Sequence, residues 1–164
     1  MSDQLILKFP ASKAYKKEDF YVSASNQKAY DFINGWPQWV KRIVNIYGPS
    51  GSGKSHLASI LKSKTSCLEI DSKKLNEKVF LNFKTREALI IENLNEKISE
   101  KLLFSLWNIA LQDNKYVLIT SINPINSYKF KLKDLVSRVN SCISIGINLP
   151  SDDLISVILA KNFS

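Results

Sequence analysis

The stretch RIVNIYGPSGSGKSHL, residues 42–57, joins an apolar run to a glycine-rich loop and the start of an amphipathic segment. Its centre, residues 48–55, matches the pattern G-x-x-x-x-G-K-[ST]. Glycine permits backbone dihedrals in which successive N–H groups point at phosphate oxygens, and a following helix presents its positive end to the same anion. The stretch therefore predicts a buried strand, a phosphate-binding loop and a helix, in that order.

The loop residues have separate expected roles. Lys54 is expected to reach the β- and γ-phosphates, and the Ser55 hydroxyl to ligate Mg²⁺. His56, the single histidine, follows on the first helical turn, where packing or exposure to solvent is favoured over acid–base or metal chemistry. A glycine turn without a ligand is the alternative. The residues expected to form the nucleotide cradle are Gly48, Gly51, Ser52, Gly53, Lys54, Ser55 and His56.

A second motif, ALIIENL at residues 88–94, places polar side chains at the end of another apolar run. Hydrolysis in a P-loop site needs a carboxylate near the metal and a base or water-positioning group beside it. Glu92 can serve the metal. Asn93 stands where such ATPases carry a glutamate, and its neutral amide can orient a water but cannot take its proton, so we predict slow or absent intrinsic hydrolysis. The alternative is that both residues merely end a strand.

Apolar runs alternate with amphipathic segments from residue 26 onward, which is typical of a parallel sheet flanked by helices. Large apolar residues recur at helical spacing in residues 97–112, so Trp107 is expected in the core. The fold class predicted is an α/β three-layer sandwich with a mostly parallel five-stranded sheet. Strands are expected at 42–47, 66–70, 88–93, 116–121 and 141–147, and helices at 54–63, 97–112, 131–139 and from Asp152.

Composition narrows the class of protein only a little. The 164 residues suit one domain, and 23 basic against 15 acidic side chains give a net charge of +8, which favours a weak, nonspecific attraction to DNA or a merely soluble lysine-rich surface. Cys67 and Cys142 are expected as buried free thiols in strands. The first ten residues lack the apolar region of a signal peptide, and we expect a bacterial cytoplasmic protein.

These motifs together resemble the AAA+ nucleotide-binding domain of the bacterial replication initiator DnaA and its relatives. The segment EDFYVSASNQKAYDFINGW, residues 18–36, is similar to the opening of that family, and the match implies that Phe20, Val22 and Asn26 contribute to the adenine pocket. DLVSRV, residues 134–139, resembles the family's arginine-finger motif. The resemblance implies that Arg138 acts catalytically on a neighbouring subunit's nucleotide; a surface arginine is the alternative.

One branch of the family, the Hda-type regulators, also resembles this chain at its start. Residues 4–9, QLILKF, are similar to the peptide by which replication proteins dock on the β sliding clamp of DNA polymerase III. Alternate apolar side chains would enter a groove on the clamp, and a short edge strand is the alternative. The clamp-binding residues implied are Gln4, Leu5, Leu7 and Phe9.

The chain also departs from the family pattern. No segment of the sequence resembles the family's helix-turn-helix domain, and residues 151–164 are expected to correspond only to the start of the helical lid. The residue that senses the γ-phosphate would fall at Ile122, with Ser121 and Asn123 as possible substitutes. We therefore expect an N-terminal arm over residues 1–19, an AAA+ domain over 20–150 and a truncated lid over 151–164. The sensor arginine of the lid is expected to be missing with it, so the resemblance makes no prediction of nucleotide affinity.

The resemblance implies a regulator that binds ATP or ADP with Mg²⁺, docks on the clamp, contacts DnaA and promotes hydrolysis of the ATP that DnaA holds. A homo-oligomer is expected. Three alternatives remain at this point: a self-sufficient ATPase such as an initiator fragment or helicase loader, a small-molecule kinase, and an adaptor without a catalytic contribution. A kinase would need a substrate pocket and an arginine-rich lid, for which the sequence gives no sign.

Overall fold

The computed structural model describes residues 20–149. The predicted N-terminal arm with its clamp-binding residues and the predicted lid over residues 151–164 lie outside this range. The elements run in the order α2 (Gln27–Asn34), β1 (Ile43–Tyr47), α3 (Lys54–Lys64), β2 (Cys67–Asp71), η2 (Ser72–Lys74), α4 (Glu77–Phe83), β3 (Ala88–Leu94), α5 (Glu100–Gln112), β4 (Tyr116–Ser121), η3 (Ile125–Ser127), α6 (Lys133–Ser141) and β5 (Ile143–Gly146).

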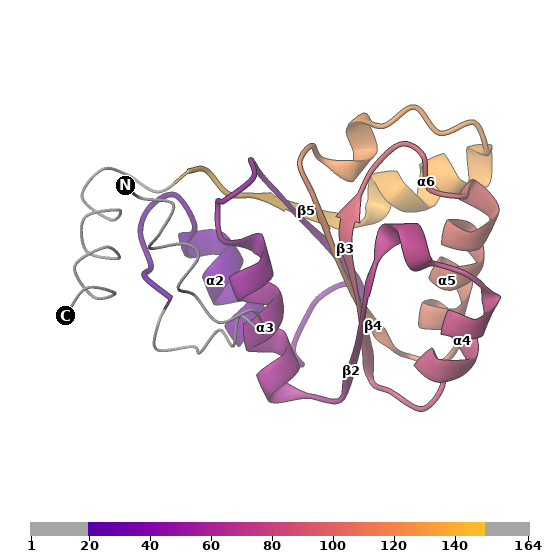
Figure 1. Cartoon of the computed structure of the whole chain (residues 1–164), viewed down its shortest axis with the longest axis horizontal. Helices are drawn as coiled ribbons and strands as arrows, with labels where there is room; N and C mark the ends of the chain where they lie inside the picture. Colours follow the sequence, from indigo (N-terminus) through magenta and orange to yellow (C-terminus); the bar gives the residue numbers. More distant parts are fainter. Residues whose placement is uncertain (1–19, 150–164) are drawn as a thin grey trace.

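The strands form one parallel sheet in the order β2-β3-β4-β1-β5, with helices on both faces (Figure 1). Helices α2 and α3 cover one face, and α4, α5 and α6 cover the other. Every neighbouring pair is parallel, so the predicted three-layer α/β architecture is confirmed. Because parallel strands share one direction, the carboxyl ends of β1, β3 and β4 meet at the same edge of the sheet.

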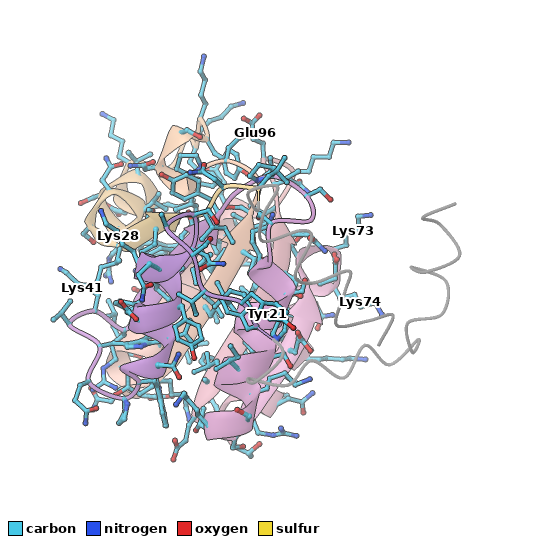
Figure 2. All side chains as sticks on the ribbon, turned by 90° about the vertical axis from the view of Figure 1, so that its left-hand side faces the viewer. Tyr21, Lys28, Lys41, Lys73, Lys74 and Glu96 are labelled. Carbon is cyan, nitrogen blue, oxygen red and sulfur yellow. The ribbon has the colours of Figure 1, made fainter. Side chains whose placement is uncertain are left out.

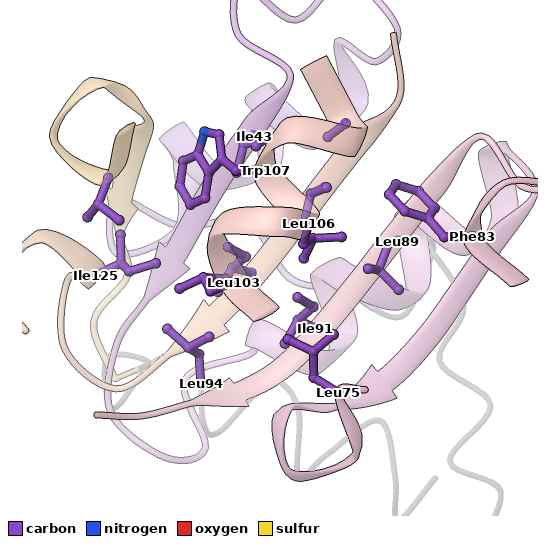
Figure 3. Close-up of a cluster of buried hydrophobic side chains, with 14 of the residues drawn as sticks. Ile43, Leu75, Phe83, Leu89, Ile91, Leu94, Leu103, Leu106, Trp107 and Ile125 are labelled. Carbon is purple, nitrogen blue, oxygen red and sulfur yellow. The ribbon is translucent and has the colours of Figure 1, made fainter. Parts of the chain in front are cut away.

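Alternate residues of the central strands enter two separate cores. Leu89 and Ile91 of β3 pack with α4 and α5, whereas Ile90 packs with α3 on the other face. Figure 3 shows the first of these cores, in which Trp107 is 3% exposed, as the helical spacing predicts. Burial on both faces explains why these strands read as continuous apolar runs.

The helices begin at recognisable capping residues. The Asn76 side chain accepts hydrogen bonds from the backbone N–H groups of Lys78 and Val79 at the start of α4, and Ser99 accepts one from Leu102 at the start of α5. Helices α2 and α4 were not predicted. Both are short, at 8 and 7 residues, so their periodicity is too brief to stand out in the sequence.

The two cysteines differ in part from the prediction. Both are free thiols, but each is only half-buried, and Cys142 caps the end of α6 one residue before β5 rather than lying in the strand. Over residues 20–149, no helix has the length and apolar character that crossing a membrane requires.

Candidate nucleotide-binding site

The glycine-rich loop lies at the carboxyl end of β1 and leads directly into α3, which begins at Lys54. Gly51 and Gly53 have φ values of 80° and 106°, in the left-handed region that favours glycine. The predicted succession of strand, loop and helix is therefore present. Backbone N–H groups of the loop and of the first turn of an eleven-residue helix are available to an anion.

The start of the loop is held tightly against the end of β5. A Cβ atom built on Gly48 would lie 2.3 Å from the carbonyl oxygen of Ile147 and 3.0 Å from Ser52 Oγ. Ser52 is buried, and its Oγ finds no hydrogen-bond partner within residues 20–149. A buried hydroxyl inside a phosphate loop is suited to donating a hydrogen bond to a phosphate oxygen.

Lys54 extends its ammonium group back over the loop. Its Nζ donates hydrogen bonds to the carbonyl oxygens of Gly48 and Pro49, the latter at 2.9 Å. Burial lowers the pKa of Lys54, and the carboxylate of Glu92 opposes that effect. The ammonium group thus lies at the loop, where it can contact phosphate groups.

A hydrogen-bonded chain of side chains joins α3 to the ends of β3 and β4. Ser55 Oγ donates to Glu92 Oε2 at 3.1 Å, and Thr120 Oγ1 donates to Glu92 Oε1 at 2.9 Å. The structure therefore brings the two residues predicted for the metal together. Thr120 was not predicted; its only sign in the sequence is a hydroxyl near the end of an apolar run.

Asn93 directly follows Glu92 and has an unusual backbone. Its φ is 62°, within an irregularity of the β3–β4 pairing between Ile91 and Leu94. Its Nδ2 donates to Asp71 Oδ2 at 3.0 Å, its N–H donates to Thr120 Oγ1 at 3.1 Å, and its carbonyl accepts from Ser72 Oγ at 2.8 Å. Asp71 was also missed, because only the β2–β3 register, which pairs it with Glu92, brings it here.

Phe20, one of the three residues predicted for the adenine pocket, lies beside the loop. The Phe20 ring stacks on Tyr30 with centroids 5.4 Å apart and meets His56 edge-on at 5.0 Å; its Cε1 lies 3.3 Å from a Cβ position built on Gly53. Phe20 therefore covers the end of the phosphate loop, and His56 packs against an aromatic ring.

Asn26 and Val22 behave differently from each other. Asn26 is buried and shapes its own turn: its Oδ1 accepts from the backbone N–H of Ser23 and its Nδ2 donates to the carbonyl of Tyr21. Val22 is 38% exposed. The carbonyl of Ser25 accepts a hydrogen bond from the N–H of Asn148, which ties this turn to the segment after β5.

A pocket of ≈ 570 Å³ opens between the ends of β4, β1 and β5. Its lining includes Lys28 of α2, Gly48 and Pro49 of the loop, and Asn148. Ile122, which occupies the expected γ-phosphate sensor position, also lines it and is 61% exposed. A pocket of this size next to a phosphate loop can hold part of a nucleotide-sized ligand.

The buried residues Asn45 and Ser121 form hydrogen bonds behind the expected sensor position, at the edge of the sheet where the pocket opens. Asn45, fully buried in β1, donates from Nδ2 to Ser121 Oγ at 2.9 Å and to the carbonyl of Ile119, and its Oδ1 accepts from the N–H of Ile125. Ser121 Oγ in turn donates to the carbonyl of Asn123. Asn45 was missed because a single amide in an apolar run reads only as a strand residue.

Arg138 lies on α6, on the face of the sheet opposite the helix that begins at Lys54. Its guanidinium carbon is 5.6 Å from the centroid of the Phe104 ring of α5, a cation–π distance. The site thus combines the loop, Glu92 and Asn93 at one edge of the sheet, and Arg138 stands apart from them.

The residues present fit a Mg²⁺–nucleotide complex. Mg²⁺ prefers oxygen ligands and in such sites is held by one or two protein groups together with phosphates and water. Ser55 Oγ and Glu92 Oε2 form such an oxygen pair. The Ser52 hydroxyl, which has no hydrogen-bond partner among residues 20–149, fits a phosphate oxygen, as do the Lys54 ammonium and the loop N–H groups.

Comparison with solved structures finds this arrangement of strands and helices in replication proteins. A crystal structure of a DNA replication initiation factor matches with a TM-score of 0.75 at 18% identity, over 90% of this chain and 53% of that one. The AMPPCP-bound DnaA of Aquifex aeolicus matches with a TM-score of 0.73 at 20% identity, over 94% of this chain and 56% of its own. The described residues therefore share the fold of these replication proteins.

Domain III of DnaA from Thermotoga maritima gives a TM-score of 0.69 at 21% identity, over 93% of this chain and 74% of that one. This chain spans about half the length of the first two of these proteins. No family model and no curated protein matches the sequence. The likeness is therefore one of fold alone.

Proposed function

We propose that this protein is a DnaA-related, nucleotide-binding regulator of replication initiation, of the Hda type, acting in the bacterial cytoplasm. It would bind ATP or ADP at the phosphate loop, dock on the β sliding clamp through Gln4, Leu5, Leu7 and Phe9, and promote hydrolysis of the ATP held by DnaA. Tethering to the clamp would raise its effective concentration near the initiator on DNA.

The observation that carries the proposal is the side chain at position 93. The loop, Lys54, Ser55 and Glu92 supply what binding a Mg²⁺–nucleotide complex requires, whereas Asn93 offers only an amide. An amide can orient a water but cannot accept its proton, which favours retention of the bound nucleotide over its rapid turnover. The bound metal would neutralise phosphate charge; Lys54 and the loop N–H groups would hold the β- and γ-phosphates.

The catalytic contribution would come from Arg138 acting on the nucleotide of DnaA. A guanidinium supplied by a neighbouring subunit stabilises charge on the γ-phosphate, an effect of roughly 10³ to 10⁵ in rate in other P-loop systems. Its position on α6, away from the chain's own loop, suits contact with a second subunit.

The test is the rate of ATP hydrolysis by DnaA in the presence of clamp-loaded DNA and this protein. We expect Arg138→Ala to lower the stimulated rate at least tenfold, and Arg138→Lys to rescue it only in part because a lysine lacks the planar fork of donors. Lys133→Ala, an exposed change on the same helix, is the matched control. Undiminished stimulation by Arg138→Ala, with ADP binding intact, would leave a non-catalytic adaptor.

Clamp docking has its own test. A peptide of residues 1–12 is expected to bind the β clamp, and the peptide carrying Leu7→Ala and Phe9→Ala is expected not to bind. Lys8→Ala in the same peptide is the control, since alternate side chains of an extended peptide face opposite sides. Equal binding by all three peptides removes the clamp from the proposal.

A further inference from the structure

Asp71 and Asn93 form a carboxylate–amide pair whose members come from neighbouring strands. Asp71 ends β2, Asn93 lies near the end of β3, and the contact joins Nδ2 to Oδ2 at 3.0 Å. The carboxylate of Asp71 is itself fixed, because its Oδ1 accepts from the N–H of Lys73 at 2.9 Å. Both hydrogen bonds lower the pKa of Asp71, that from Asn93 most strongly, so this carboxyl group is ionised near neutral pH.

The backbone around Asn93 is arranged to keep this contact. A φ of 62° is costly for a residue other than glycine, although asparagine tolerates it best. The Ser72 hydroxyl holds the carbonyl of Asn93 and the Thr120 hydroxyl holds its N–H. Thr120 also donates to Glu92, so the pair connects through two hydrogen bonds to the residue expected at the metal.

From this geometry we infer that Asp71 is a positioning residue for hydrolysis at this site: its carboxylate holds Asn93 with the amide N–H turned to β2, which leaves the amide oxygen Oδ1 for the attacking water. An ionised carboxylate only accepts hydrogen bonds, so it selects the Nδ2 end of the amide. The carboxylate that could act as a base, that of Asp71, is thereby placed on β2, and the amide that would orient the attacking water, that of Asn93, is placed on β3.

The inference rests on the proposed nucleotide binding and explains why turnover would be slow. In the reaction, the water oxygen forms a bond to the γ-phosphorus, the bridging oxygen leaves with the bonding electron pair as ADP, and the water proton passes to the phosphate because Oδ1 of a neutral amide cannot take it. Exchanging the side chains of Asp71 and Asn93 would place a carboxylate, which can accept the water proton, at position 93.

The experiment is a double-mutant cycle with Asp71→Asn, Asn93→Asp and the double variant, measured for ATP turnover by the full chain alone. Asn93→Asp by itself sets two carboxylates against each other, which disfavours ionisation of one of them. We expect the double variant to exceed Asn93→Asp in kcat by about tenfold or more, since a positioned base contributes roughly 10²- to 10⁴-fold. Its KM should stay within about twofold of the unchanged protein. Asp113→Asn, an exposed carboxylate at the far end of α5, is the matched control.

A second readout does not depend on turnover. In a ¹⁵N-labelled sample the Asn93 side-chain amide protons should shift on Asp71→Asn and not on Asp113→Asn. A double variant no faster than Asn93→Asp, or an Asn93 amide signal indifferent to Asp71, overturns the inference. Binding of fluorescent ADP distinguishes failure of this inference from failure of the proposed function. If neither the unchanged protein nor any variant binds ADP, the proposed function fails. If ADP binding is intact but the effects of the two substitutions on turnover simply add, only the role of Asp71 is rejected.

Discussion

Gly48 begins the phosphate loop with its Cα packed against the backbone that follows β5. Since a Cβ there would meet the Ile147 carbonyl at 2.3 Å, Gly48→Ala must displace either the loop or the segment after β5. We expect the affinity for ADP to fall about tenfold or more, which corresponds to about 1.4 kcal/mol, as measured by calorimetry. Gly35→Ala, where the nearest atom is 3.4 Å away, should leave affinity unchanged. Equal affinities would mean that the loop does not depend on this contact.

Cys67 provides a prediction on pH at the same scale. Burial raises the pKa of its thiol to about 11, so at pH 8 its thiolate is about 100-fold less populated than that of a cysteine at the ordinary value of 9.0. We expect iodoacetamide to modify Cys67 at least 100-fold more slowly in the folded protein than in urea. Because the folded state holds this proton more tightly, stability should fall as pH rises from about 9 towards 11. Equal rates in both states would contradict the shift.

At the scale of the element, β1 contains a buried residue, Asn45, whose side chain links β1, β4, β5 and the 3₁₀ helix η3. Asn45 contacts β4 through Ile119 and Ser121, β5 through Ser144 at 3.4 Å, and η3 through Ile125. Asn45→Ala would leave the buried N–H of Ile125 without its acceptor. A cost of about 2 kcal/mol in the free energy of unfolding is expected from urea titration. Asn140→Ala, exposed on α6, should cost less than about 0.5 kcal/mol.

The elements also show what the sequence could and could not predict. All five strands were predicted because each contains a run of apolar residues, although only β1, β3 and β4 are buried on both faces and the edge strands β2 and β5 are half-buried. The phosphate loop was predicted because the glycines of residues 48–55 favour its backbone conformation. The local sequence pattern did not predict α2 and α4, because both helices are too short for a clear periodicity. It did not predict the contact of Asp71, because that contact depends on the register between β2 and β3. The contact of Asp71 with Asn93 exists only because β2 pairs in parallel with β3, a fact of tertiary structure.

At the scale of the whole molecule, positive charge is distributed rather than gathered. Figure 2 shows Lys28 and Lys41 on one side and Lys73 and Lys74 on the other. With a net charge of +8, we expect weak binding of single-stranded DNA that depends on counterion release and declines steeply between about 50 and 200 mM salt. Fluorescence anisotropy with oligonucleotides of two unrelated sequences tests this; affinity that withstands salt, or that differs between the sequences, would point to a built DNA site instead.

Phe20 is held beside the phosphate loop by its contacts with Tyr30, His56 and the region over Gly53. Ten residues, 10–19, separate this ring from Phe9, the last residue of the proposed clamp peptide. Fully extended, that linker reaches about 40 Å at most. If the clamp peptide docks as proposed, the nucleotide of a clamp-bound copy would lie within about one small-protein diameter of the clamp surface, and contact with DnaA would be expected there.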